Sequence, residues 1–273
     1  MELNPAVFTG IALLSLCCEF MDASIGMGYG TTLTPLLLIF GLPPLQVVPA
    51  VLLGQLIGGA AGGIAHQRLG NIKLDFRRDE AIIKQRLRWL GYLPRSLDAK
   101  VVFVLAGCGI IGALVGALTA LNIPKVALTT YIGVVVLGTG IVILLRRNYA
   151  GSISWKGLIG VGLLSSFNKG ISGGGYGPLV TGGQIISGRE ARSSVGSTTV
   201  AEAVVCIVGF LAYLLAKGDI FWALAAATSI GAIVAGPFAA MTVRKVNPDK
   251  LKIIIGLATI ALGGYTLLKT FVL

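Results

Sequence analysis

The sequence is poor in the residues from which catalytic and metal sites are built. It has a single histidine and four cysteines among 273 residues, and only 12% of its residues are charged. The four cysteines fall in apolar stretches and form no CxxC pair, which favours packing over metal binding or redox chemistry. Enzyme active sites need clusters of titratable side chains. We therefore predict a protein that is not an enzyme and that holds no metal and no cofactor.

Hydrophobic residues are, in contrast, abundant. They make up 55% of the chain, and its mean hydropathy is +0.88. Values this high exclude an ordinary soluble domain and predict an all-α polytopic membrane protein. Most of the apolar stretches reach the roughly 20 residues that a spanning helix needs and three are shorter, so we expect about 8–10 transmembrane segments. The stretches cover residues 5–22, 26–40, 46–66, 101–121, 125–145, 157–168, 175–187, 194–216, 219–240 and 249–270.

The net charge of +11 is concentrated in a few loops. Eighteen of the 22 Lys and Arg residues lie in the segments 67–100, 146–156, 188–192 and 242–252, which alternate with segments that hold one Lys each. Basic loops of membrane proteins face the cytoplasm, so both termini are expected on the periplasmic or extracellular side. This placement favours the lipid bilayer, and not nucleic acid, as the partner of the basic residues.

One glycine-rich motif occurs twice. Residues 26–55 and residues 173–202 align at an offset of 147 positions without a gap. The Gly-Tyr-Gly of residues 28–30 falls on that of residues 175–177. Glycine breaks in apolar sequence predict broken or re-entrant helices, and a matched pair of breaks is typical of the substrate site of a secondary transporter.

The repeat divides the chain into two halves. The first covers residues 1–146 and contains a hydrophilic insert at 75–98, and the second covers residues 147–273. Each half is expected to cross the membrane an odd number of times, so the two would have opposite orientations and form inverted repeats. The insert fits either an amphipathic helix on the inner leaflet, ended by Pro94, or a solvated basic loop.

Two further patterns have a structural interpretation. Residues 107–112 match GxGxxG, but they lie inside an apolar stretch with no strand before them. They predict close helix packing and not a dinucleotide site. The only histidine, His66, lies where an apolar stretch meets the basic insert, and we interpret it as an interfacial anchor.

Ionisable residues at membrane depth are costly, so each is a candidate functional residue. Asp22 and Lys169 correspond to each other under the offset of 147, just before the two glycine breaks. They could neutralise each other as a structural ion pair. Alternatively, Lys169 could bind an anion while carboxylates couple transport to an ion gradient. The candidate coupling residues are Asp22, Glu19 and Glu202.

Small polar side chains accompany these charges in both halves. Glycine breaks free backbone N–H groups, and the N-terminus of the following helix has a partial positive charge. Together with hydroxyls and an ammonium, they suit a tetrahedral oxyanion, although any single Ser or Thr more often bonds to its own helix. The predicted substrate-binding residues are Ser24, Gly28, Tyr29, Gly30, Thr31, Gln55, Lys169, Ser172, Gly175, Tyr176, Gly177 and Thr198.

Four segments resemble those of a known family: GMGYGTTLTPLLLIFG, GISGGGYGPLVTGG, VVPAVLLGQ and SVGSTTVAE. The family is that of the sulfite exporter TauE/SafE, also called toluene sulfonate uptake permeases. The resemblance covers nearly the whole chain outside the insert. It implies a secondary active transporter of the bacterial or archaeal inner membrane that moves sulfite, sulfonates such as sulfoacetate, or related oxyanions.

The resemblance leaves several alternatives open. Alternating access could be coupled to protons or to sodium, in either direction, by a monomer or a homo-oligomer. A carrier for other small organic anions such as carboxylates, or a passive anion channel, would also tolerate paired glycine breaks.

Overall fold

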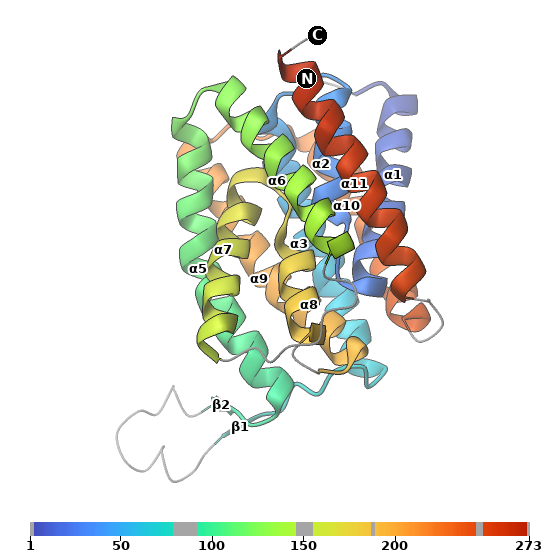
Figure 1. Cartoon of the computed structure of the whole chain (residues 1–273), viewed down its shortest axis with the longest axis vertical. Helices are drawn as coiled ribbons and strands as arrows, with labels where there is room; N and C mark the ends of the chain where they lie inside the picture. The colour runs from blue at the N-terminus through green and yellow to red at the C-terminus, as the bar shows by residue number, and fades with distance from the viewer. Residues whose placement is uncertain (1–2, 79–91, 146–154, 187–188, 244–247, 272–273) are drawn as a thin grey trace.

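The computed structural model describes residues 3–78, 92–145, 155–186, 189–243 and 248–271, which form a helical bundle (Figure 1). The chain is an all-α polytopic membrane protein, as predicted. A short antiparallel hairpin, β1 (Phe76–Arg78) with β2 (Tyr92–Pro94), lies at one end of the bundle. The described helices are α1 Pro5–Ile25, α2 Tyr29–Ile39, α3 Pro44–Arg68, α5 Leu97–Asn122, α6 Lys125–Leu145, α7 Trp155–Ser172, α8 Tyr176–Ile186, α9 Ala191–Lys217, α10 Trp222–Thr242 and α11 Pro248–Phe271.

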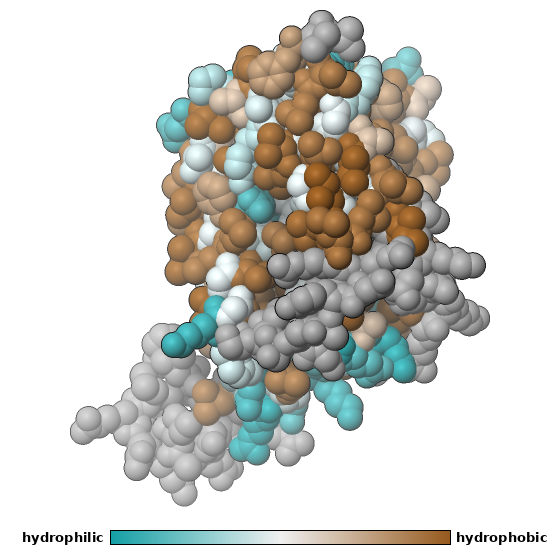
Figure 2. All heavy atoms as spheres, in the orientation of Figure 1, coloured by the Kyte–Doolittle hydropathy of each residue, from teal (hydrophilic) through white to brown (hydrophobic). Residues whose placement is uncertain are grey.

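Six of the described helices are long and apolar enough to cross a membrane: α1, α3, α5, α6, α9 and α10. Helices α7 and α11 have 18 and 24 residues, whereas α2 and α8 have 11 each. Hydrophobic side chains cover most of the bundle on the face in Figure 2, and hydrophilic ones gather mainly at its lower end. Exposed residues such as Phe103 (61% exposed) and Leu215 (83% exposed) suit contact with hydrocarbon.

Both chain termini lie at the same end of the bundle, and β1 and β2 lie at the opposite end (Figure 1). The chain therefore returns to the side from which it starts, as an even number of crossings requires. The described ends of the basic insert, residues 75–78 and 92–98, are thus on the side away from the termini. That this side is cytoplasmic stays a prediction from the charge pattern.

Both predicted helix breaks are present. Helix α1 ends at Gly26, which has a left-handed φ of 74°, and Gly28, with a φ of 133°, precedes α2. Helix α7 is followed in the same way by Gly173 (φ 73°) and Gly175 (φ 80°), which precede α8. Residues with a side chain rarely adopt such φ values, so glycine allows the chain to turn and to begin a second helix at each break.

The two breaks contact each other through their backbones. A Cβ on Gly30 would overlap the carbonyl oxygen of Gly173, and a Cβ on Gly177 would overlap that of Gly26. These two contacts are equivalent under the offset of 147 residues. Glycine is needed for such a close approach, and the approach brings the N-termini of α2 and α8 together inside the bundle.

Helix packing is reciprocal between the two halves. Helices α1 and α3 of the first half pack against α10 of the second, and α7 and α9 of the second half pack against α5 of the first. Further extensive contacts join α3 to α9 and α6 to α11, which hold the same positions in their halves. Exchanging the halves leaves this set of contacts unchanged, as an internal two-fold axis would require.

Small residues allow these helices to approach closely. On α5, Gly112 and Gly116 lie against the backbone of α7 at Leu163 and Phe167. Within the GxGxxG pattern of residues 107–112, a Cβ on Gly107 would meet nothing within 4 Å, whereas Gly109 and Gly112 pack against α9 and α7. This confirms the packing interpretation, since a side chain at these positions would force the helices apart.

The insert begins and ends in the β hairpin. At its base, the backbone nitrogen of Arg95 donates a hydrogen bond to the carbonyl oxygen of Asp75 at 2.9 Å. The amphipathic helix predicted within the insert falls mainly on residues 79–91, which lie outside the described residues. Pro94, which was expected to end that helix, lies in β2.

His66 is buried, and the interpretation as an interfacial anchor is wrong. Its side chain is 0% exposed at the end of α3, with Nε2 2.9 Å from the carbonyl oxygen of Ala23. The amide nitrogen of Asn71 lies 3.1 Å from Nδ1 and 3.0 Å from the carbonyl oxygen of Ala240. Because the amide of Asn71 donates to Nδ1, the ring proton is on Nε2 and is donated to Ala23. A polar residue near the end of a span can be buried when neighbouring helices supply its partners.

Candidate functional site

Four polar side chains form a continuous row inside the bundle, here called the central cluster: Asp22, Gln55, Lys169 and Glu202. Gln55 Nε2 donates a hydrogen bond to Asp22 Oδ2 at 2.9 Å, and Lys169 Nζ donates to Gln55 Oε1 at 3.5 Å. Lys169 Nζ also forms an ion pair with Glu202 Oε1 at 2.7 Å. All four residues are at most 2% exposed. The row therefore provides each buried charge with a polar partner, as burial demands.

The central cluster is built from equivalent positions of the two halves. Asp22 and Lys169 lie in the last turns of α1 and α7, and Gln55 and Glu202 lie within α3 and α9. Asp22 and Lys169 do not form the direct ion pair that we considered, because Gln55 lies between them and Glu202 pairs with Lys169. The helix breaks and the crossing of the halves thus place one cation among acidic groups from both halves.

Glu19 is a further acidic group beside the central cluster. It lies one turn before Asp22 on α1 and is 0% exposed. Neither of its carboxylate oxygens has a hydrogen-bond partner among the described residues. Its carboxyl is close enough to Asp22, Lys169 and Glu202 for their charges to interact. Within the described ranges, no three His, Cys, Asp or Glu residues are arranged as metal ligands.

At the first break, the helix N-terminus is capped by the protein itself. Asp22 Oδ1 accepts a hydrogen bond from the backbone nitrogen of Tyr29, the first residue of α2, at 3.2 Å. A carboxylate is favourable there because the helix N-terminus has a partial positive charge. The hydroxyl of Tyr29 lies 3.0 Å from that of Ser15, which donates to the carbonyl oxygen of Thr228 at 2.5 Å. Tyr29 therefore has internal partners for both its nitrogen and its hydroxyl.

At the second break, the corresponding groups differ. The position of Asp22 is taken by Lys169, a cation, just before α8. The position of Tyr29 is taken by Tyr176, whose hydroxyl is buried and has no hydrogen-bond partner among the described residues. The second break therefore has an ammonium just before a helix N-terminus, both of which favour an anion, and the Tyr176 hydroxyl is a further buried donor.

Other buried polar atoms near the breaks also have no hydrogen-bond partner among the described residues. Two belong to hydroxyls of α2, two to hydroxyls of α7 just before Lys169, and one is the second carboxylate oxygen of Glu202. Buried hydroxyls are normally hydrogen-bonded, so each such group calls for an explanation, and a ligand is one. The four hydroxyls are those of Thr31, Thr34, Ser165 and Ser166.

Two predicted binding residues have other partners. The hydroxyl of Ser24 lies 3.4 Å from that of Thr242 on α10 and is not part of the central cluster. The hydroxyl of Ser172 donates to the carbonyl oxygen of Asn168 at 2.6 Å and accepts from the backbone nitrogen of Gly174 at 3.2 Å. Ser172 thus stabilises the turn of the second break.

Tyr131 was not predicted as part of the site. Its hydroxyl donates a hydrogen bond to Asn168 Oδ1 at 2.5 Å and so joins α6 to α7 beside the second break. Gly175 lies next to the same asparagine, since a Cβ there would be 3.4 Å from Asn168 Cβ. A tyrosine in an apolar helix needs a hydrogen-bond partner for its hydroxyl. That requirement is the feature of the sequence from which a polar contact of Tyr131 could have been predicted.

Comparison with known proteins identifies the family of the chain. A family model described as sulfite exporter TauE/SafE matches residues 11–78 and 85–266. The chain belongs to the TauE/SafE family. This TauE/SafE protein is also 28% identical over 280 residues to the "Probable membrane transporter protein YtnM" of Bacillus subtilis (strain 168), over 97% of its own length and 83% of that relative. No solved structure matches it. The resemblance seen in the glycine motifs is confirmed, and the protein is a membrane transporter.

The site of this TauE/SafE transporter contains more acid than base. Lys169 pairs with Glu202, and the carboxyl groups of Asp22 and Glu19 are close enough for their charges to interact with it. If every group were ionised, the site would have a net negative charge, which is costly inside a membrane. Protonation of a carboxyl group or binding of a cation would lower this cost.

Proposed function

We propose that this protein is a secondary active transporter of small sulfur-containing anions, such as sulfite, sulfoacetate and other sulfonates, or related oxyanions, across the inner membrane. The observation on which this rests is the position of Lys169. It is a buried ammonium at the second glycine break, where the equivalent residue of the first break is Asp22. The family membership and the YtnM relative support a transport function.

The anion binds, on this proposal, at the second break. At the first break, Asp22 supplies a carboxylate to the N-terminus of α2. At the second, the substrate supplies the negative charge to the N-terminus of α8. Lys169 and the hydroxyl of Tyr176 are the donors, with the backbone N–H groups freed by Gly175. A sulfonate or sulfite has three oxygens that can accept from such a set of donors.

Competition for Lys169 couples the anion to a proton. Lys169 is held by Glu202 at 2.7 Å, so the anion must replace that carboxylate. Glu202 would then be an unpaired charge in a buried position, at a cost of several kcal/mol. It avoids this cost by taking up a proton. Anion binding and protonation of Glu202 therefore occur together, and the anion and the proton are released together.

Glu19 and Asp22 adjust the charge balance. The carboxyl of Glu19 has no hydrogen-bond partner among the described residues, so it is best kept neutral by a proton. The hydrogen bonds that Tyr29 and Gln55 donate to Asp22 favour its ionised form. A sodium ion held by the same carboxylates is the alternative coupling ion.

Alternating access follows from the two halves. We propose that residues 1–146 and 147–273 are inverted repeats. The reciprocal packing of α10 on the first half and of α5 on the second supports this, as do the equivalent glycine contacts at the breaks. Rocking of the helices around the fixed crossing would open the central cluster first to one side and then to the other.

Counterflow in proteoliposomes tests the proposal. Proteoliposomes that contain the purified protein are loaded with unlabelled anion and exposed to labelled sulfite, thiosulfate, sulfoacetate, taurine or acetate. We expect exchange of sulfite or a sulfonate, faster when the outside is acidic. Preference for acetate would indicate a carboxylate carrier, and an anion-selective reversal potential without counterflow would indicate a channel. Either result would contradict the proposal.

A further inference from the structure

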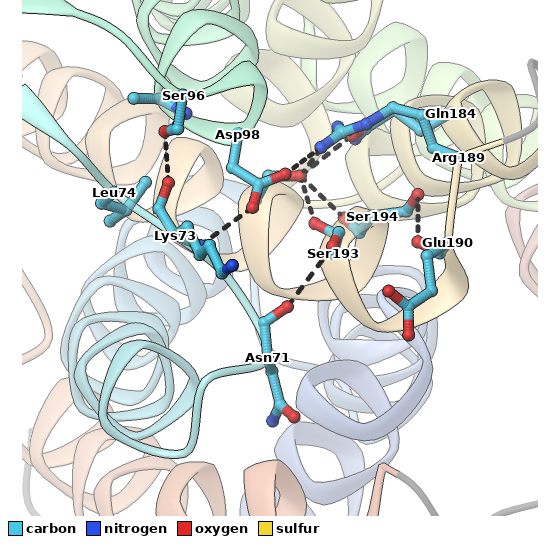
Figure 3. Close-up of polar contacts among 12 residues, drawn as sticks. Asn71, Lys73, Leu74, Ser96, Asp98, Gln184, Arg189, Glu190, Ser193 and Ser194 are labelled. Carbon is cyan, nitrogen blue, oxygen red and sulfur yellow. Dashed lines mark hydrogen bonds and ion pairs between the residues drawn. The ribbon is translucent and has the colours of Figure 1, made fainter.

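A second group of polar residues, here called the Arg189 cluster, consists of Asp98, Gln184 and Arg189, which Figure 3 labels, together with Ser197. The guanidinium of Arg189, between α8 and α9, forms an ion pair with Asp98 and hydrogen bonds with Gln184 and Ser197. The side chains of Arg189 and Asp98 are only 12% and 13% exposed. Burial lowers the pKa of Arg189 from its ordinary value, and the carboxylate of Asp98 opposes this shift. The guanidinium therefore stays charged.

The ion pair joins the two halves of the chain. Asp98 lies in the first turn of α5, and its second oxygen accepts a hydrogen bond from the backbone nitrogen of Lys73 at 2.9 Å. Ser96 caps the same helix by accepting from the backbone nitrogen of Ala99 at 3.1 Å. Asp98 is thus fixed to the first half, at the base of the hairpin, whereas Arg189 belongs to the second.

Polar side chains continue from Arg189 toward the central cluster. Gln184 accepts a hydrogen bond from Ser197 at 2.9 Å and donates one to Thr198 at 2.9 Å. These three residues are at most 1% exposed. Thr198 precedes Glu202 by one turn of α9, a rise of about 6 Å. These polar side chains, here called the polar path, therefore extend from the hairpin end of the bundle to one helical turn from Glu202.

The equivalent positions of the first half are apolar. Three of them lie in the buried core and are 0% exposed. A charged solute is costly beside apolar side chains, so a path of this kind is needed wherever an anion passes. Only the second half provides it at these positions. Gln184, Arg189, Ser197 and Thr198 correspond, at the offset of 147, to Leu37, Leu42, Ala50 and Val51.

We propose that Arg189 is a second anion-contacting residue of this transporter, and that it binds the transported oxyanion at the hairpin end of the polar path when it separates from Asp98. This rests on the proposed function. The planar fork of a guanidinium matches two oxygens of a sulfonate, a sulfite or a carboxylate. In the structure the carboxylate of Asp98 takes that position. Asp98 therefore competes with the anion for Arg189 and, while bound, holds the two halves together.

Three variants and a control test this role in vesicles of both orientations. Arg189→Gln should raise the KM for sulfite at least about tenfold on the hairpin face, because a charge-assisted hydrogen bond is lost, and should change it little on the opposite face. Arg189→Lys should give a smaller rise, because the fork is lost but the charge is kept. Asp98→Asn should lower the KM on the hairpin face. Arg192→Gln is the control, since Arg192 lies nearby in the first turn of α9 but has a side chain that is 40% exposed and paired with Glu190.

The charge-swapped double variant Asp98→Arg with Arg189→Asp separates anion contact from a purely structural ion pair. It keeps an ion pair between α5 and the α8–α9 loop but leaves no guanidinium at position 189. We expect thermal stability to recover toward that of the unmodified protein and the KM to stay raised. Recovery of the KM would overturn the inference, as would unchanged kinetics in Arg189→Gln, and both would leave the proposed function standing. Absence of exchange in the unmodified protein would instead contradict the proposed function itself.

Discussion

The first glycine break has an anionic side chain at its helix N-terminus, whereas the second has a cation in the corresponding position. Asp22 accepts a hydrogen bond from the backbone of Tyr29 at the start of α2. Lys169 stands 147 residues later, before α8, and pairs with Glu202. The tyrosines differ as well, because the hydroxyl of Tyr29 is hydrogen-bonded and that of Tyr176 has no partner among the described residues.

This difference shows how two matched segments can keep one backbone and take different tasks. The crossing needs glycine in both, because each break touches the backbone of the other. The side chains around the crossing can diverge, since buried charge must balance over the whole cluster and not within each half. On the proposed function, the first break supplies its own anionic group and the second receives the substrate.

The largest effect is expected where the two breaks are equivalent. Gly30→Val and Gly177→Val should both prevent folding, since each new side chain would overlap the opposite backbone. The free-energy cost of that overlap should exceed the about 1–3 kcal/mol that overpacking of a core usually costs. Gly182→Val on α8 is the control, because a Cβ there meets nothing within 4 Å. Size-exclusion chromatography of the purified variants measures the folded yield. If Gly177→Val alone folded normally, the packing of the two breaks would not be equivalent.

The next effect separates coupling from binding. Glu202→Gln keeps the shape of the side chain and removes its titration, so it should spare counterflow and abolish accumulation driven by a pH gradient. Gln55, the equivalent residue of the first half, already is an amide. Uptake of labelled sulfite into proteoliposomes with and without a pH gradient measures both properties. Retained pH-driven accumulation in Glu202→Gln, Asp22→Asn and Glu19→Gln alike would contradict proton coupling and favour sodium.

Lys169→Ala should weaken anion binding by about 1–3 kcal/mol, the usual scale for a lost charge-assisted hydrogen bond. Asp22→Asn should weaken it less, because that carboxylate caps α2 and does not contact the anion on this account. Isothermal titration of each variant with sulfite gives the two affinities. A larger loss in Asp22→Asn than in Lys169→Ala would reverse the tasks assigned to the two breaks.

The smallest effect concerns the two tyrosine hydroxyls. Tyr29→Phe should lower the free energy of unfolding by about 1 kcal/mol, because the hydrogen bond with Ser15 is lost, and should leave the KM unchanged. Tyr176→Phe should leave stability unchanged and raise the KM about three- to tenfold, because a donor to the anion is lost. Thermal unfolding and counterflow kinetics on both variants check this. Identical effects of the two substitutions would show that the hydroxyls have the same role.

Much of the fold could be predicted from the sequence because its signals are local. Hydropathy identifies the long apolar helices, and the glycines at positions 26–30 and 173–177 identify the breaks, since only glycine adopts the required φ values freely. The matching of the two motifs also predicted which residues would be equivalent. Asp22 with Lys169 and Gln55 with Glu202 indeed meet in one cluster.

The partners within the site could not be predicted, because they depend on contacts between distant helices. Nothing local to Lys169 shows that it pairs with Glu202 and not with Asp22. The same holds for Arg189 and Asp98, which are 91 residues apart. The sequence around Arg189 indicates only a basic loop, and Asp98 is only the last residue of the insert. His66 was misplaced for the same reason, since its partners come from α1 and from Asn71.

The central claim is that the anion and a carboxylate compete for Lys169, so that each bound anion brings a proton. The most direct test is isothermal titration of the purified protein with sulfite or sulfoacetate in two buffers of different ionisation enthalpy, which counts the protons taken up per anion. The account predicts uptake of about one proton by the unmodified protein and none by Glu202→Gln. This follows from linkage, because Glu202 is the carboxylate that the anion displaces from Lys169 and that then takes up the proton. Binding with no proton uptake in the unmodified protein, or with equal uptake in Glu202→Gln, would contradict it.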